Sequence, residues 1–334
     1  MSKNSAALTS LLIGLIFIVG CPSIESKPIE SVQAGPTTIE SPKAEPSAEP
    51  TIESSPQKTE PTKAETPISE PAKPQPKLYV SFHDKCADIL KEYVNEEGMV
   101  DYDALKKRKL QLKNLLDEFA GLDPNEYNSW PKEDKIAFWI NAYNMQLLNI
   151  IVSNYPIQAT RIRMVFWPPT SIRHIPGIWD TYKFIVMDEE FTLGEIERRF
   201  FRQGFVEPRV FLALSYASLS SPPLRNEPYY GHKLYEQLDD QARKFLLSPN
   251  GLYIDRNAQI VYISPILKPA WFGNEFVSMY GTDKKFKDQQ PPVRAILNFI
   301  TNYISKEDVS FLEIKNYSVD YLKYDWRLNE QTGK

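Results

Sequence analysis

The stretch that decides the fold runs Ile136-Ala-Phe-Trp-Ile-Asn-Ala-Tyr-Asn-Met-Gln-Leu-Leu-Asn-Ile-Ile-Val152. Apolar residues occur on nearly every side when it is wound as a helix, and Pro131 suits the first turn of such a helix. A helix that is hydrophobic all round lies inside a core rather than on a surface. We therefore predict a central buried helix at residues 132–153, with the rest of the fold packed around it.

Patterns on both sides of this helix predict a helix-rich domain with a few short strands. A Thr192-Leu-Gly-Glu195 capping box marks the start of one helix. Further helices are predicted at 83–94, 103–119, near 270–280 and at 292–304, a turn at 188–190, and strands at 183–187, 252–254, 260–263 and 311–314. Because helices and hairpins do not alternate regularly, we predict an α+β fold with short antiparallel strands, formed as a single domain by residues 78–334.

The N-terminus has the features of a secretory signal. Lys3 precedes an apolar stretch at residues 6–19, which small Gly20 ends. A membrane-spanning helix needs about 20 apolar residues with suitable flanks, so an uncleaved transmembrane anchor is the alternative that we disfavour. Residues 1–20 are therefore predicted to be a signal peptide.

The tetrad Ile18-Val-Gly-Cys21 resembles the lipobox of bacterial lipoproteins, whose cysteine takes a diacylglyceryl group. This resemblance implies that Cys21 is lipidated and that the mature protein is anchored to a membrane of the bacterial cell envelope. Pro22 stands where inner-membrane lipoproteins usually carry aspartate, which favours the outer membrane. Residues 21–77 are dominated by Pro, Glu, Ser and Thr and lack aromatic residues, so we predict a disordered tether.

Composition and motifs exclude several classes of function. The chain has 39 Lys and Arg against 43 Asp and Glu, and it has no basic stripe interleaved with aromatic residues, so we predict no nucleic-acid partner. It contains no P-loop, no dinucleotide-binding glycine pattern and no Gly-x-Ser-x-Gly elbow. Its histidines, His83, His174 and His232, lack the spacing of metal ligands, so we predict neither a metal nor another cofactor.

Two polar segments are candidates for a functional site. Asn141 and Asn144 are one helical turn apart, so their amides share a face and either hold neighbouring backbone or line a polar pocket. Residues 207–225 contain a short apolar strand-like piece, a cluster of serines, a double proline and an arginine. A rigid turn with hydroxyl-to-backbone hydrogen bonds is the simplest interpretation of this second segment.

Five sequence motifs together resemble the DUF547 family, a domain of unknown function. They are Phe138-Trp-Ile-Asn-Ala-Tyr-Asn144, Phe191-Thr-Leu-Gly-Glu-Ile-Glu197, Pro208-Arg-Val210, Ser221-Pro-Pro-Leu-Arg225 and Tyr324-Asp-Trp-Arg-Leu-Asn329. Together they extend the resemblance from about residue 85 to residue 329. The resemblance implies a domain of this type, and no reaction is settled for the family.

Members of the family usually carry a histidine after the Pro-Arg-aliphatic triplet and a cysteine at each of two later positions. The resemblance therefore implies a site of the cysteine-hydrolase kind in those members. Here Phe211 stands in place of the histidine, and Tyr216 and Ser221 stand in place of the cysteines. A serine hydroxyl needs a positioned base, which Phe211 cannot provide. Composition therefore excludes thiolate chemistry at this site.

We interpret the chain first as a non-catalytic binding or scaffold protein. Its pocket would be lined by Asn141, Asn144, Arg209, Ser220 and Arg225. The partner would be a small molecule, a peptide or another envelope protein, which would be bound without turnover because nucleophile and base are both replaced.

Two alternatives stay open. In the first, a hydrolase or acyl transferase uses Ser221 as its nucleophile and His174 or His232 as its base, although both histidines are predicted to lie in surface loops. In the second, the protein has only a structural role in the envelope and presents aromatic side chains such as Trp271 and Phe272 to other proteins.

Overall fold

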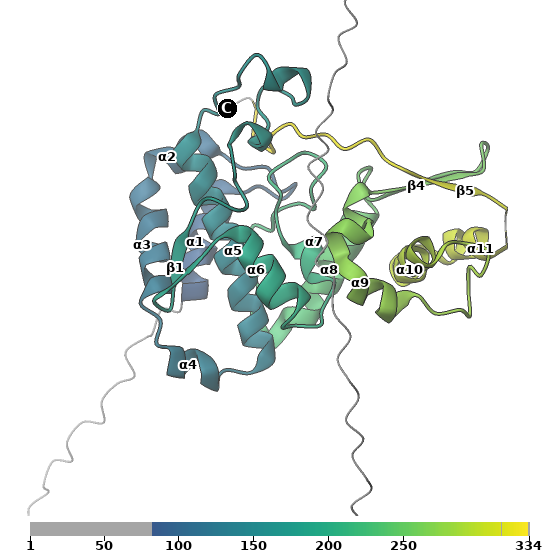
Figure 1. Ribbon diagram of the computed structural model, residues 1–334, viewed down its shortest axis with the longest axis horizontal. Coiled ribbons are helices and arrows are strands. Elements are labelled where there is room, and N and C mark those ends of the chain that lie inside the picture. The colour runs from purple at the N-terminus through teal and green to yellow at the C-terminus, as the bar shows by residue number, and fades with distance from the viewer. Residues whose placement is uncertain (1–81, 315, 333–334) are drawn as a thin grey trace, which may run out of the picture. The chain divides into compact units, whose positions relative to one another are not determined.

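Helix α5 (Lys132–Asn154) lies among the other elements of the computed structural model (Figure 1). Every side chain from Ile136 to Leu148 is buried, so the helix has no solvent-facing stripe over that length. This confirms the central buried helix predicted at 132–153, which ends one residue later than predicted. Contact with protein on all sides explains why its sequence shows almost no amphipathic pattern.

The structure describes residues 82–314 and 316–332. The predicted signal peptide at 1–20, the predicted lipidation site Cys21 and the predicted tether at 21–77 all lie outside the described residues. The described residues form an α+β fold in one domain, as predicted. None of their helices has the length and apolar character needed to cross a membrane.

Four helices precede α5 in the described residues, and they are α1 (Phe82–Tyr93), α2 (Tyr102–Lys107), α3 (Lys109–Ala120) and α4 (Pro124–Ser129). Helix α1 confirms the prediction at 83–94. The single helix predicted at 103–119 is wrong, because the chain breaks at Arg108 (φ −113°, ψ 23°). Neither glycine nor proline marks the break. Leu105 and Leu112, on its two sides, are both fully buried.

A hairpin and a capped helix follow α5. Strand β1 (Phe184–Val186) pairs antiparallel with β2 (Glu189–Phe191) through the two-residue turn Met187-Asp188, in which both residues have positive φ. The strand predicted at 183–187 is confirmed, but the turn is earlier and shorter than predicted. The Thr192–Glu195 capping box is present and opens α6 (Leu193–Ile196), which continues as a π-helical turn, η3 (Glu197–Arg202). Between α5 and β1 lie two 3-10 turns, η1 (Arg163–Val165) and η2 (Ile172–His174).

The second part of the fold contains α7 (Val210–Ala213), η4 (Gly231–Lys233), α8 (Leu234–Leu246), β3 (Leu252–Asp255), β4 (Ile260–Ile263), η5 (Pro265–Leu267), α9 (Pro269–Tyr280), α10 (Pro291–Ile300), α11 (Lys306–Ile314) and β5 (Ser318–Tyr321). Strands β3 and β4 form the predicted antiparallel hairpin, and β5 adds parallel to β4, with Val319 opposite Val261. Helices α9 and α10 agree with the predictions near 270–280 and at 292–304. The side chain of Phe272 lies outside the described residues.

Two predicted strands are wrong. The strand predicted at 311–314 is the last turn of α11, which begins after Ser305, where the hydroxyl accepts the N–H of Asp308 at 3.1 Å. The strand-like piece in 207–225 is the single helical turn α7. A run of four or five apolar residues has no measurable period, so the sequence could not separate a buried helical turn from a short strand.

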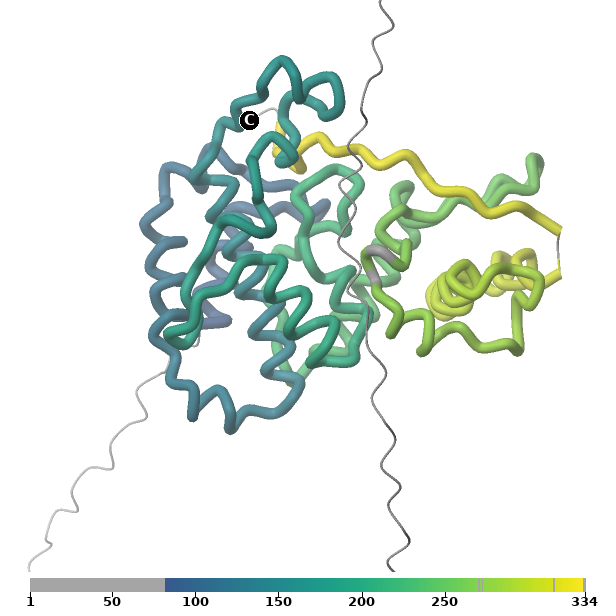
Figure 2. Tube along the Cα trace, in the orientation of Figure 1, coloured from purple at the N-terminus to yellow at the C-terminus, as the bar shows by residue number. Residues whose placement is uncertain are grey.

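After β5 the chain runs back toward the first helices of the domain (Figure 2). There the N–H of Val100 donates to the carbonyl of Asn329 at 2.8 Å, and the N–H of Gln331 donates to the carbonyl of Val100 at 2.9 Å. On the way, the carbonyl of Arg327 accepts the N–H of Leu219 at 2.9 Å. The motif at 324–329 therefore joins the two ends of the domain and covers the serine cluster.

Candidate functional site

Two buried amides of α5 hold the segment 213–230, which carries the serine cluster and the double proline. Asn141 Nδ2 donates to the carbonyl of Tyr229 at 2.8 Å, and the Tyr229 N–H donates back to Asn141 Oδ1 at 2.9 Å. Asn144 pairs in the same way with the carbonyl of Ala213 (3.0 Å) and the N–H of Ser215 (2.9 Å). Each side chain replaces a peptide group, so the two asparagines hold backbone, which is one of the two roles predicted for them.

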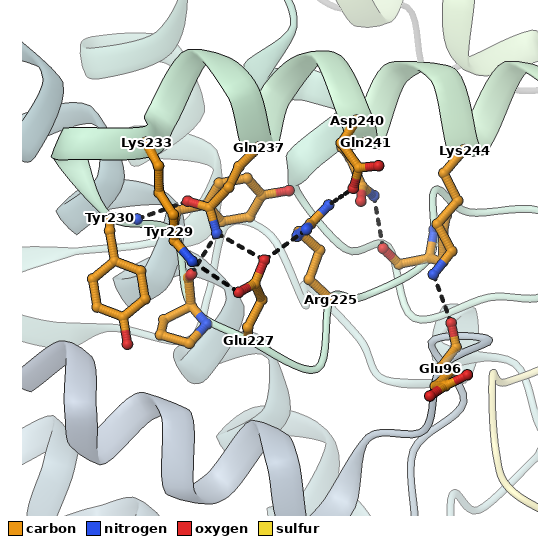
Figure 3. Close-up of polar contacts among 12 residues, drawn as sticks. Glu96, Arg225, Glu227, Tyr229, Tyr230, Lys233, Gln237, Asp240, Gln241 and Lys244 are labelled. Atoms are coloured by element: carbon orange, nitrogen blue, oxygen red, sulfur yellow. Dashed lines mark hydrogen bonds and ion pairs between the residues drawn. The ribbon is translucent and has the colours of Figure 1, made fainter.

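Helix α8 also forms hydrogen bonds with this segment (Figure 3). Gln237 accepts the N–H of Tyr230 at 2.9 Å and donates to the carbonyl of Pro228 at 2.9 Å. Gln241 donates to the carbonyl of Pro223 at 2.8 Å. Buried backbone polar groups need partners, and this segment has little regular secondary structure to supply them. Side-chain amides of α5 and α8 therefore supply hydrogen-bond partners to the backbone of this segment.

Arg209 and Arg225 are both paired with carboxylates. Arg209 lies 2.7 Å from Asp239 of α8. Arg225 pairs with Asp240 of the same helix (Figure 3). Arg225 also lies 2.6 Å from Glu227. Arg225 ties the segment to α8, and Arg209 ties the residues just before the segment to the same helix. A role for them in binding a ligand stays a prediction.

Glu227 is the centre of this polar network (Figure 3). It accepts hydrogen bonds from Arg225 at 2.6 Å, Lys233 at 3.0 Å and Gln237 at 3.1 Å. Burial alone would raise the pKa of Glu227, but the three hydrogen bonds outweigh burial and lower it to about 2. The carboxylate therefore stays ionised through the neutral and mildly acidic range.

The predicted nucleophile, Ser221, has its hydroxyl engaged on both sides. Its Oγ accepts the N–H of Tyr216 at 2.9 Å and donates to the carbonyl of Pro222 at 2.9 Å. Both partners are backbone groups. Over the described ranges no imidazole bonds to this hydroxyl, and a serine without a base is a poor nucleophile.

His174 is buried, which corrects the prediction that it lies on the surface. Its Nε2 donates to the carbonyl of Pro168 at 2.9 Å. Ile172 and Ile175, which precede and follow the histidine, are buried, so the chain places His174 inside the domain. His174 thus fixes the backbone before η2, whereas His232 is exposed, as predicted.

Phe211 and Tyr216 are packed in the core, each with 1% exposure. The guanidinium of Arg202 lies 4.7 Å from the centre of the Phe211 ring, and Trp271 packs edge-on against Tyr216 at 4.8 Å. The Tyr216 hydroxyl has no hydrogen-bond partner among the described residues, and burial raises its pKa far above the ordinary value. A phenol held protonated in this way cannot serve as a nucleophile or a base near neutral pH.

A partly buried carboxylate beside these rings was missed by the sequence analysis. Glu197 accepts a hydrogen bond from the Tyr143 hydroxyl at 2.7 Å and lies 4.0 Å from Arg202. Burial raises the pKa of Glu197, and its charge adds to the raised pKa of Tyr216. Tyr143 and Glu197 both belong to motifs that carry the family resemblance, and that membership was the available signal. Their separation in sequence gave no sign that they touch.

An open groove of about 650 Å³ lies between residues 164–168 and 323–327, with Ser220 and Asn250 also in its lining. We call it the aromatic groove, because its lining includes Phe166, Trp167, Tyr324 and Trp326. Of the residues predicted for the site, only Ser220 lines it.

The aromatic groove has unused polar groups. Trp167 and Trp326 pack edge to face at 5.7 Å, and the guanidinium of Arg173 lies over both rings, at 4.5 and 5.2 Å. Within the described part of the chain, neither indole N–H has a hydrogen-bond partner and Arg173 has no carboxylate partner. Lys323, at the rim, is likewise without an ion pair there. The indole N–H groups and the two cations are therefore available to bind a ligand.

The predicted site residues do not converge on one pocket. A second cavity, of about 320 Å³, is lined by Ser218, Ser221, Lys244 and Asn329 among others. Asn144 and Arg209 are absent from the described lining of both this cavity and the aromatic groove. The described residues also contain no cluster of three His, Cys, Asp or Glu side chains that could hold a metal ion.

Comparison with known families supports the resemblance inferred from the motifs. Residues 127–246 match the model of a protein of unknown function, DUF547. The chain resembles the DUF547 family over this segment. The match contains α5, the β1–β2 hairpin, the segment 213–230 and α8, while the motif at 324–329 lies beyond it. No curated protein and no solved structure is significantly similar to the chain.

Replacing Asn144 with leucine should destabilise the domain strongly. The substitution Asn144→Leu leaves the carbonyl of Ala213 and the N–H of Ser215 buried without partners, and each such group costs about 1–3 kcal/mol. Urea unfolding should therefore show a loss of about 2–5 kcal/mol. Asn149→Leu, a half-buried control on the same helix with one 3.3 Å hydrogen bond, should change stability much less. Equal losses in the two variants would contradict the role assigned to Asn144.

The network around Glu227 predicts a pH-dependent contribution to stability. Because the folded-state pKa is lowered to about 2, the stabilisation is complete above the ordinary glutamate range and is lost as pH falls toward 2. Glu227→Gln should lower the free energy of unfolding at pH 7 by about 1 kcal/mol or less, since the site is partly exposed. The difference from the parent chain should shrink between pH 4.5 and 2. Glu236→Gln, an exposed control on α8, should show no such trend, and a pH-independent difference for Glu227→Gln would refute the assignment.

Proposed function

We propose that the protein is a non-catalytic binding protein whose ligand occupies the aromatic groove. The observation that carries the proposal is the set of unused groups in the groove lining, which are two indole N–H donors and the ammonium of Lys323. The guanidinium of Arg173, which is not itself in the described lining, lies against the same two indole rings. Binding sites for small ligands are concave, lined with aromatic side chains and equipped with a few convergent polar groups. The aromatic groove meets each of these conditions.

The absence of turnover follows from the groups that would have to react. The Ser221 hydroxyl is held between two backbone partners, and the His174 Nε2 is bonded to the Pro168 carbonyl. Phe211 and Tyr216 fill the positions where related chains carry an imidazole and a thiol. An enzyme of the acyl-transfer kind needs a nucleophile with a base in hydrogen-bond reach, and these contacts supply none.

The chemistry of the groove favours an acidic carbohydrate. Indole and phenol rings offer flat apolar faces with a polar edge, and sugar rings present matching apolar C–H faces and hydroxyl groups. The cations Arg173 and Lys323 favour a ligand that also carries a carboxylate. Asp325, the acidic residue in the described lining, is paired with Arg327 at 2.5 Å and so adds little repulsion.

The proposal can be tested by calorimetric titration of the full chain. An N-acetylmuramic-acid-containing disaccharide, which bears a carboxylate, should bind more tightly than neutral chitobiose. Trp326→Ala should weaken binding of both sugars by tenfold or more, which corresponds to about 1.4 kcal/mol. Lys323→Glu should weaken only the acidic sugar, and Tyr253→Ala, an exposed aromatic control on β3, should weaken neither. Affinities that these groove variants leave unchanged would exclude the groove as the site.

We also propose that the protein acts as a lipoprotein of the bacterial cell envelope, anchored through Cys21. The support is the signal-like segment at 1–20 and the tetrad that ends at Cys21. In bacteria fed a labelled fatty acid, Cys21→Ala should abolish label incorporation and change the processing of the chain, and globomycin should block processing of the parent chain. Unchanged gel mobility with no labelled lipid on the parent chain would rule out the anchor.

A further inference from the structure

The segment 161–166, at the edge of the aromatic groove, holds apolar side chains out in solvent. Exposure reaches 80% for Ile162, 42% for Met164, 79% for Val165 and 72% for Phe166. In Figure 2 the chain between α5 and β1, coloured teal, projects at the top of the view beyond the packed helices. A contiguous group of exposed apolar side chains is uncommon on a soluble surface and marks a contact site.

The backbone of this segment is held in place, so the exposure is built into the fold. The N–H of Met164 donates to the carbonyl of Thr160 at 3.0 Å, and the N–H of Phe166 donates to the carbonyl of Arg163 at 3.0 Å. The Arg163 guanidinium in turn donates to the carbonyl of Arg173 at 3.0 Å. These bonds form the turn η1 and fix its apolar side chains outward.

Cations surround the apolar side chains. Arg161 is exposed, and neither it nor Arg163 forms an ion pair within the described residues. Arg173 and Lys323 are also unpaired there, and Asp325 is already neutralised by Arg327. The whole chain has a net charge of −4, so this face departs from the overall acidity of the protein. Like charges gathered in this way favour a strongly anionic partner.

We propose that the segment 161–166 is a membrane-contact element whose apolar side chains enter the headgroup region of an anionic bilayer while the neighbouring cations meet lipid phosphates. Bulky apolar groups combined with basic residues are what binding at a membrane interface requires. A protein partner would need a much larger surface, since stable interfaces take about 800 Å² and 20–30 residues from each side. The inference does not depend on the groove binding a sugar.

The test places an environment-sensitive nitrobenzoxadiazole dye on the contact element of the full chain. A Cys21→Ser background removes the sulfur at that position and any acyl chain on it, while Cys86 is fully buried. The dye is attached at Val165→Cys or, as a matched control, at Leu110→Cys, a lone exposed leucine (69%) beside Lys109 on α3. Each protein is mixed with phosphatidylglycerol or phosphatidylcholine vesicles, with and without spin-labelled lipid that quenches the dye.

The dye at position 165 should shift to shorter wavelength and be quenched at least twofold in phosphatidylglycerol vesicles, with little change in phosphatidylcholine. The control at position 110 should respond in neither. Adding Arg161→Glu and Arg163→Glu should reverse most of the response at 165. Equal responses at 165 and 110, equal responses in the two lipids, or no response at 165 would each overturn the proposal. Loss of sugar binding alone would leave it standing, because the readout reports lipid contact only.

Discussion

The pairing of the α5 amides with the backbone of segment 213–230 is the constraint on which the rest of the site depends. This segment runs through the interior without a sheet or a long helix to satisfy its N–H and carbonyl groups, and unpaired groups there would be costly. Asn141 and Asn144 act as substitute peptide groups, and α8 completes the set. With the segment fixed, its serines face the 324–329 motif, and Tyr216 packs near Glu197.

The same constraint determines what chemistry the interior can support. Tyr216, a buried phenol with a raised pKa, stands where the family resemblance predicts a thiol, and Phe211, stacked under Arg202, stands where it predicts an imidazole. Glu197 accepts a hydrogen bond from the Tyr143 hydroxyl. Neither Phe211 nor Tyr216 offers a nucleophile that this carboxylate could activate. At the surface, the indole N–H groups of Trp167 and Trp326, which line the aromatic groove, have no hydrogen-bond partner among the described residues. Interior packing and surface chemistry are therefore consistent with the binding role that we propose.

Local patterns predicted the parts of the fold that have a clear period. The all-round apolar α5, the capping box at Thr192 and the β3–β4 hairpin follow from composition and spacing. The break at Arg108 did not, because neither glycine nor proline marks it, and the helical nature of 311–314 did not, because so short an apolar run has no measurable period. The orientation of Asn141 and Asn144 was predictable from helical spacing. The aromatic groove was not, since residues 164–168 and 323–327 are brought together only by the returning C-terminal chain.

The most direct test of the central claim is the reactivity of Ser221 in the folded full chain. A fluorophosphonate probe forms a covalent adduct with serines that are activated by a base, and peptide mass spectrometry locates the adduct. The account predicts no adduct on Ser221, because its hydroxyl is held between the Tyr216 N–H and the Pro222 carbonyl. Stoichiometric labelling of Ser221 that disappears in Ser221→Ala would contradict it and establish a serine-dependent enzyme.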